Sequence, residues 1–193
     1  QPRRPVDLGQ AAPEMVFGAR MAACSGAVME SGPVAQYVKM GNGWGPGALH
    51  YFFAGLTRKL DRSTVESEVL RALAEWARYA PLDFTPAFAP HSSRTLSILF
   101  ARGAHGDGYP FDGPGKVLAH TFYPSPPNPE SIAGDMHFDD DESWQVGNRV
   151  DLFTVALHEA GHALGLGHSD NPGSVMYPYY RQAAALSADD IAG

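Results

Sequence analysis

The sequence predicts one domain of the α+β class. Its 193 residues are the length of one ordinary domain, and 44% of them are hydrophobic, which is enough for a sizeable core. Some apolar residues alternate with polar ones, as strands do, whereas others recur with the period of a helix. The segments follow one another as strand, helix, two strands, a loop-rich stretch and a helix, with no internal repeat.

The first half of this order begins with a predicted strand at Leu49–Ala54. Ser63 and Glu66 have the spacing of a capping box, which predicts the start of a helix at this point. Pro81 ends that helix because proline cannot continue the helical hydrogen bonds. The apolar face of the helix consists of Val65, Val69, Leu73 and Trp76.

The second half contains two strands and a long stretch of loops. Leu82 and Phe84 predict one strand, and the alternation of Leu96, Ile98 and Phe100 predicts the next. Residues 102–142 are rich in Gly, Pro, Asp and His, with short strand-like runs only at 117–122 and 136–138. So many turn residues indicate that something other than packing holds this segment. A helix is expected at 150–164, and another helix begins near 186–190.

Composition excludes several classes of function. Fourteen Lys and Arg against 21 Asp and Glu give a net charge of −7, which argues against nucleic-acid binding through the phosphate backbone. No apolar run approaches the roughly 18 residues that a membrane span needs. Cys24 is the single cysteine, so no intrachain disulfide can form.

A metal site is predicted by the segment from His158 to His168. On a helix, His158 and His162 project from one face one turn apart and can hold one ion. Gly165 lets the chain leave the helix through a left-handed conformation, which brings His168 to the same ion. Three imidazoles leave a fourth zinc position open, as in catalytic sites, and Glu159 is placed to act on a water there. A solvated amphipathic helix would explain the first two histidines and Glu159, but not the extended pattern.

This pattern, followed by a methionine turn at Ser174–Pro178 containing Met176, is the metzincin signature. Ser169, directly after the third histidine, resembles the matrix metalloproteinases, or matrixins, within that clan. The segments 100–108, 110–115, 118–120 and 137–144 are also similar to matrixin segments. The resemblance covers residues 37–193 and leaves residues 1–36 as a leader or propeptide-like segment. It implies a twisted, mostly parallel sheet of about five strands with three helices and a zinc cleft between an upper and a lower part.

The resemblance also implies two further metal sites. The loop-rich segment offers four N and O ligands, which fill a tetrahedral coordination sphere as in a structural zinc site. The family has its structural zinc at the same four positions: His105, Asp107, His120 and His137. Hard oxygen ligands suit calcium, and the family's calcium site corresponds to the carboxylates of Asp112, Asp139 and Glu142 and the carbonyls of Gly113, Gly115 and Val117. A solvated acidic turn is the alternative for 139–142.

A second calcium site of the family is only partly matched, so one or more calcium ions are expected. Asp135 matches one of its ligands, but Thr95 stands where the family usually has Asp. Ser131 and Ala133 replace glycines of the surrounding loop.

The predicted reaction is hydrolysis of peptide bonds by a zinc-activated water with Glu159 as general base. An extended substrate would pair with the strand at 117–122, including Leu118 and Ala119. The resemblance implies a pocket for the residue after the scissile bond, with Thr154 setting its depth; its walls would be Leu157, Tyr177, Pro178 and Tyr180. Leu157 and Tyr177 are equally compatible with the core.

The remaining expectations concern latency, partners and location. Cys24 lacks the flanking residues of a matrixin latency cysteine, and Asp7 is a weaker candidate for that role. Asp189 and Asp190 match family residues that anchor the mature N-terminus. Alternatives to an active protease are a zymogen held latent by residues 1–36 and a metal-stabilised module that binds peptides without cleaving them. The resemblance implies a secreted or extracellular monomer that acts on proteins or peptides.

Overall fold

The computed structural model describes residue 40 and residues 42–193. The predicted leader, with Asp7 and Cys24, lies outside the described residues. No helix in the described part of the chain is long and apolar enough to cross a membrane.

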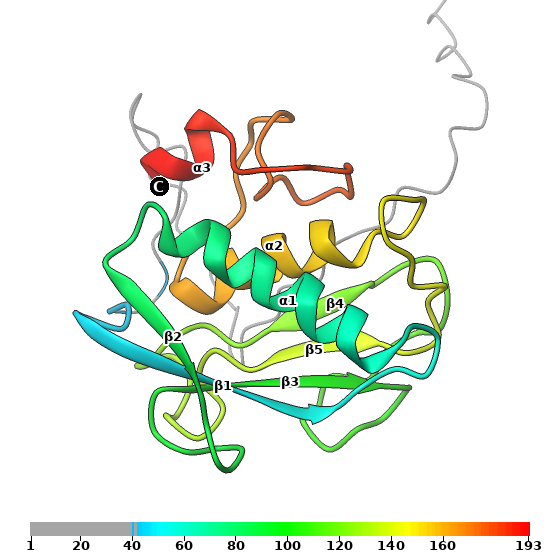
Figure 1. The fold of residues 1–193 in the computed structure, drawn as a ribbon, viewed down its shortest axis with the longest axis horizontal. Helices are drawn as coiled ribbons and strands as arrows, with labels where there is room; N and C mark the ends of the chain where they lie inside the picture. Colours follow the sequence, from blue (N-terminus) through cyan, green and yellow to red (C-terminus); the bar gives the residue numbers. More distant parts are fainter. Residues whose placement is uncertain (1–39, 41) are drawn as a thin grey trace, which may run out of the picture.

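A five-stranded sheet forms one layer of the domain (Figure 1). Its spatial order is β2-β1-β3-β5-β4, in which all neighbours pair in parallel except β4 and β5, which are antiparallel. This arrangement, with three helices, confirms the predicted mostly parallel sheet. The strands are β1 (Gly47–Gly55), β2 (Leu82–Pro86), β3 (Thr95–Ala101), β4 (Ala119–Thr121) and β5 (Met136–Asp139).

The helices begin and end close to the predicted positions, but the first helix begins differently. The structure has α1 (Arg62–Ala77), α2 (Leu152–Leu164) and α3 (Ala188–Ala192). The predicted capping box at Ser63 is wrong: Asp61 is the N-cap, and its side chain makes no capping hydrogen bond. Asp61 has extended backbone angles, so the helix starts early enough to place Ser63 inside its first turn. A capping box does form at α3, between Ser187 and Asp190.

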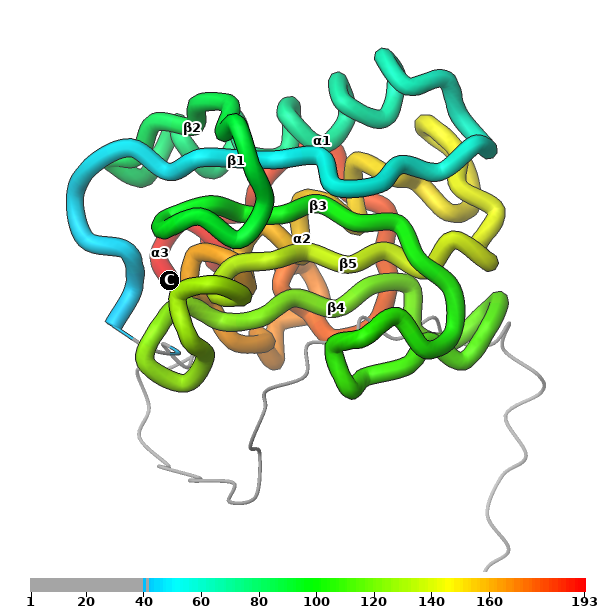
Figure 2. Tube along the Cα trace, turned by 90° about the horizontal axis from the view of Figure 1, so that it is seen from below, coloured from blue at the N-terminus to red at the C-terminus, as the bar shows by residue number. Residues whose placement is uncertain are grey.

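Both long helices cover the same face of the sheet, as the view from below makes clear (Figure 2). The predicted apolar face of α1 is buried, and the indole N–H of Trp76 donates to the carbonyl of Leu157 in α2 at 2.8 Å. β3 departs from the expected alternation because this central strand is covered on both sides: Thr95 and Ser97 are buried along with Leu96 and Ile98. The core therefore lies between the sheet and the two helices.

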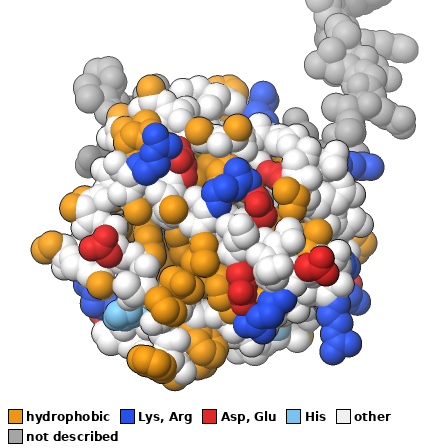
Figure 3. Space-filling model, in the orientation of Figure 1, with side chains coloured by type: hydrophobic (Ala, Val, Ile, Leu, Met, Phe, Trp, Pro, Cys, Tyr) orange, Lys and Arg blue, Asp and Glu red, His pale blue; other side chains and the backbone are white. Residues whose placement is uncertain are grey.

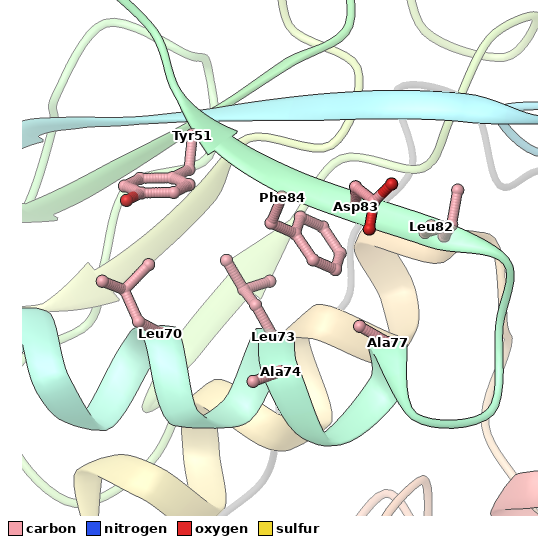
Figure 4. Close-up of a pocket in the computed structure, with 8 residues that line it drawn as sticks. All are labelled: Tyr51, Leu70, Leu73, Ala74, Ala77, Leu82, Asp83 and Phe84. Atoms are coloured by element: carbon pink, nitrogen blue, oxygen red, sulfur yellow. The ribbon is translucent and has the colours of Figure 1, made fainter.

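An apolar hollow opens at the surface between α1 and β2. It has a volume of about 280 Å³ and is walled by Leu70 and Leu73 of α1, Phe84 of β2 and Tyr51 of β1, with Asp83 as its one charged group (Figure 4). Orange hydrophobic side chains gather over this region of the surface in the same orientation as Figure 1 (Figure 3). None of the predicted site residues lines it.

Candidate metal centre and active site

Helix α2 positions the first two histidines of the predicted zinc site. Asp151 caps the helix by accepting from the backbone N–H of Thr154 at 3.0 Å. His158 and His162 are fully buried one turn apart, and their Nε2 atoms are 2.9 Å from each other. The helix therefore directs both imidazoles to one point, as the i, i+4 spacing predicts.

Gly165 brings the third histidine to the same point. It ends α2 with φ 107°, a left-handed conformation that strongly favours glycine. A β-carbon here would also lie 3.0 Å from the carbonyl oxygen of Met40. Beyond this turn, the Nε2 atom of His168 lies 3.2 Å from that of His162.

Backbone carbonyls orient two of these rings. Nδ1 of His158 lies 2.7 Å from the carbonyl of Val175, and Nδ1 of His162 lies 2.7 Å from the carbonyl of Leu166. These contacts place the proton on Nδ1 and leave the Nε2 lone pair free for a metal.

Burial favours the neutral rings that a metal requires. Burial lowers the pKa of His158 to about 3 and that of His168 to about 4, and it holds the pKa of His162 well below its usual value. Lone pairs that converge at this distance repel one another unless a cation lies between them. Ligands about 2.0–2.1 Å from a tetrahedral zinc are roughly 3.3 Å apart, close to the spacings seen here. The three histidines thus fit a zinc ion.

Met176 is fully buried against α2, where Gly161 makes room for it. A β-carbon at Gly161 would come within 2.3 Å of the Met176 sulfur. Asp190 of α3 holds the turn in place: its carboxylate accepts from the backbone N–H groups of Val175 and Met176 at 3.0 and 3.1 Å. The sequence did not predict this role for Asp190.

Glu159 is fully buried next to His158 on α2. Its Oε2 accepts a hydrogen bond of 2.7 Å from the hydroxyl of Thr121 in β4. Its Oε1 is buried and has no hydrogen-bond partner among the described residues. Burial raises the pKa of Glu159 to about 8, and the hydrogen bond from Thr121 acts in the opposite direction. Thr121 was not predicted from the sequence, because no local motif marks it.

The four residues of the predicted structural zinc site also lie together. One oxygen, Oδ2 of Asp107, lies 2.8 Å from Nε2 of His105, 2.7 Å from Nε2 of His120 and 2.9 Å from Nδ1 of His137. Burial lowers the pKa of His120 to about 4 and also lowers that of His137, so both favour the neutral form. This second group of N and O atoms is consistent with a closed, structural zinc site.

The residues of the predicted calcium site meet where the 112–117 loop contacts the turn after β5. Glu142 accepts from the backbone N–H of Gly115, and Asp112 from that of Val117 at 3.3 Å. Asp139 is fully buried, and its Oδ2 has no hydrogen-bond partner among the described residues. Burial raises the pKa of Asp139 to about 6, and the neighbouring carboxylates Asp141, Glu142 and Asp112 raise it further. The ammonium group of Lys59 donates to the carbonyls of Asp140 and Glu142.

At the position of the second family calcium, a histidine approaches the one matching ligand. Nδ1 of His91 lies 3.4 Å from Oδ2 of the buried Asp135 and 3.0 Å from the carbonyl of Ser131. Asp135 also accepts from the backbone N–H of Ser97 at 2.8 Å.

The predicted substrate-contacting residues divide between β4, α2 and the segment after Met176. Ala119 is the first residue of β4, an edge strand of the sheet, and Leu118 directly precedes it. Thr154 and Leu157 are buried on α2, whereas Tyr177, Pro178 and Tyr180 are half-buried. The Thr154 hydroxyl donates to Asp151, which ties it to the helix cap.

A three-histidine centre on a helix that ends in a left-handed glycine, above a buried methionine turn, defines a metzincin-type site. Residues 43–193 match the matrixin family. The chain is 42% identical to human matrilysin over 83% of its length, 40% identical to karilysin from Tannerella forsythia over 78%, and 44% identical to stromelysin-2 from Rattus norvegicus over 78%. The chain belongs to the matrixin family, as its motifs predicted. The aligned regions span 61% of matrilysin and 32% of each of the other two relatives.

Proposed function

We propose that this chain is a zinc-dependent endopeptidase that hydrolyses peptide bonds with Glu159 as general base. The observation that carries the proposal is the pairing of three converging Nε2 atoms with an adjacent buried carboxylate that has one oxygen without a partner. When bound, zinc would polarise the scissile carbonyl and make water acidic enough to attack near neutral pH.

The protein's own residues then move the proton. Next to a bound cation, the pKa of Glu159 would lie below the value that burial alone sets, so the ionised Oε1 would take the proton from the attacking water and deliver it to the leaving amine. The other carboxylate oxygen of Glu159, Oε2, keeps its hydrogen bond from the Thr121 hydroxyl. Such a route needs no covalent intermediate, because the nucleophile is water.

The edge strand β4 supports binding of an extended peptide. β4 pairs with β5 on one side, and its place at the end of the sheet order leaves its other side for an added strand at Leu118 and Ala119. We infer that the side chain after the scissile bond enters a pocket bounded by Leu157, Tyr177, Pro178 and Tyr180. Thr154 lies at the start of α2, where a small side chain leaves depth for Leu or a similar residue.

Calcium at the turn after β5 is part of the same proposal. The unpartnered Oδ2 of buried Asp139 and its raised pKa both indicate carboxylates that a cation would stabilise. We infer that Asp112, Asp139 and Glu142 bind Ca²⁺, with the carbonyls of Gly113, Gly115 and Val117 completing the site. Calcium ligands of this kind and the matrixin relationship support an extracellular location and protein or peptide substrates.

The proposal is tested with an internally quenched peptide carrying Leu after the scissile bond, with zinc and calcium present. The wild-type chain is compared with Glu159→Gln and with Glu130→Gln, a control at an exposed carboxylate. Cleavage by the wild type and the control, lost in Glu159→Gln at equal zinc content, is expected.

Two other outcomes separate the alternatives. Binding of the peptide without cleavage by any variant would support a peptide-binding module instead. Activity that appears only after removal of residues 1–36 would identify a latent zymogen.

A further inference from the structure

We propose that Thr121 is a positioning residue for catalysis: its hydroxyl fixes the carboxylate of Glu159 so that Oε1 is the oxygen that handles the proton. This inference rests on the proposed peptidase function and deepens it. The hydrogen bond is 2.7 Å long and joins two fully buried side chains from different elements, β4 and α2.

Strand geometry explains why Thr121 can reach the general base. Successive side chains of a strand point to opposite faces. His120 contacts Asp107 in the second metal group, so Thr121 faces the other way, towards α2. The same strand carries Ala119 two residues earlier on the face of Thr121, next to the proposed peptide-binding edge. A short strand thereby connects the substrate edge to the general base.

The hydrogen bond from Thr121 restricts the orientation of the Glu159 carboxylate. An unanchored Glu side chain rotates about its last torsion, whose preference is broad. With Oε2 held by Thr121, the remaining oxygen is the one without a partner among the described residues. A buried carboxylate oxygen needs a hydrogen-bond donor, and the attacking water and the leaving amine are such donors. The two oxygens therefore have separate tasks, one for orientation and one for proton transfer.

Thr121→Val is the decisive substitution because valine keeps the branched shape and strand preference of threonine and replaces only the hydroxyl, with a methyl group that cannot donate. Thr121→Ser restores a hydroxyl. Thr95→Val is the matched control: Thr95 is a buried threonine of the same sheet, and its hydroxyl donates to the carbonyl of Ser93. For each variant, kcat and KM are measured separately on the quenched peptide, together with bound zinc and the melting temperature.

We expect Thr121→Val to lower kcat by about 10- to 100-fold, the order of loss that follows a misplaced catalytic group, with KM and zinc content unchanged. Thr121→Ser should recover most of kcat, and Thr95→Val should retain it. A crystal structure of zinc-bound Thr121→Val should show the Glu159 carboxylate rotated or in several orientations.

Several results would overturn the role of Thr121. They are an unchanged kcat in Thr121→Val, an equal loss in Thr121→Ser, a change confined to KM, or a Glu159 carboxylate that keeps its orientation without the hydroxyl. A wild-type chain that cleaves nothing, before or after removal of residues 1–36, would instead reject the peptidase function. The crystal structure still decides the positioning in that case, because it does not depend on turnover.

Discussion

Replacing Asp190 by alanine should destabilise the domain through the methionine turn. Asp190 is buried, and its carboxylate accepts from the backbone N–H groups of Val175, Met176 and Ser187. It also accepts from the hydroxyls of Ser174 and Ser187. One side chain of α3 therefore satisfies donors from the turn beneath the metal centre and from its own helix cap.

The size of the effect follows from which donors lose their acceptor. Met176 N–H keeps the Ser174 hydroxyl oxygen at 3.0 Å, but the N–H groups of Val175 and Ser187 have no other acceptor among the described residues. A buried donor left unsatisfied costs about 1–3 kcal/mol, and the partly exposed Ser187 belongs at the lower end. Asp190→Ala should thus lower the free energy of unfolding by about 2–4 kcal/mol, a large part of the roughly 5–15 kcal/mol typical of a domain.

The assay is urea unfolding followed by circular dichroism at fixed zinc and calcium concentrations, because bound metal itself adds stability. Asp190→Asn retains one acceptor oxygen and should lose about half as much. Asp170→Asn, at an exposed carboxylate in the same region, is the control. An Asp190→Ala midpoint equal to that of the control would refute the reasoning.

The Asp190 carboxylate also makes the stability of the domain depend on pH. Burial acts to raise the pKa of Asp190, but the hydrogen bonds from Ser174, Ser187 and Val175 outweigh it, so the pKa lies below its usual value. A depressed pKa means that this stabilisation is fully present above about pH 4 and is lost as the pH falls through the folded value. The difference in stability between wild type and Asp190→Asn should therefore shrink on acidification below pH 4.

Three further predictions follow from other contacts. Gly161→Ala should lower the free energy of unfolding and weaken zinc binding by about 1–3 kcal/mol, because the new β-carbon overlaps the Met176 sulfur. Urea unfolding and zinc titration would measure both, and unchanged values would contradict the close contact between Gly161 and Met176. Lys59→Met removes the ammonium that donates to two carbonyls of the turn after β5, so the melting temperature should fall most when calcium is chelated. An equal fall at saturating calcium would argue against the idea that Lys59 and calcium both stabilise this turn. His120→Ala should reduce bound zinc from two ions to one per chain, measured by elemental analysis, and retention of both ions would reject the second zinc site.

The parts of the fold predicted correctly are those that depend on local periodicity. The apolar face of α1, the two short strands in the loop-rich segment and the helix that carries His158 and His162 all follow from spacing along the chain. The capping box at Ser63 failed because Asp61, two residues earlier, is an equally good cap residue, and a pattern alone does not choose between them. The strand predicted from Leu96, Ile98 and Phe100 forms as β3, but the alternation did not show that Thr95 and Ser97 on the opposite face are buried as well, because burial of the second face depends on the tertiary structure.

The sequence by itself determined the three-histidine centre and the matrixin relationship. One turn of helix separates His158 from His162, and Gly165 is placed to return the chain, so a segment of eleven residues carries its own geometry. Only the tertiary structure decided which groups hold that centre in place. Thr121 reaches Glu159 from a strand 38 residues away along the chain, and Asp190 reaches the methionine turn from α3. These hydrogen bonds depend on how separate elements pack against one another, and no local pattern in the sequence encodes that packing.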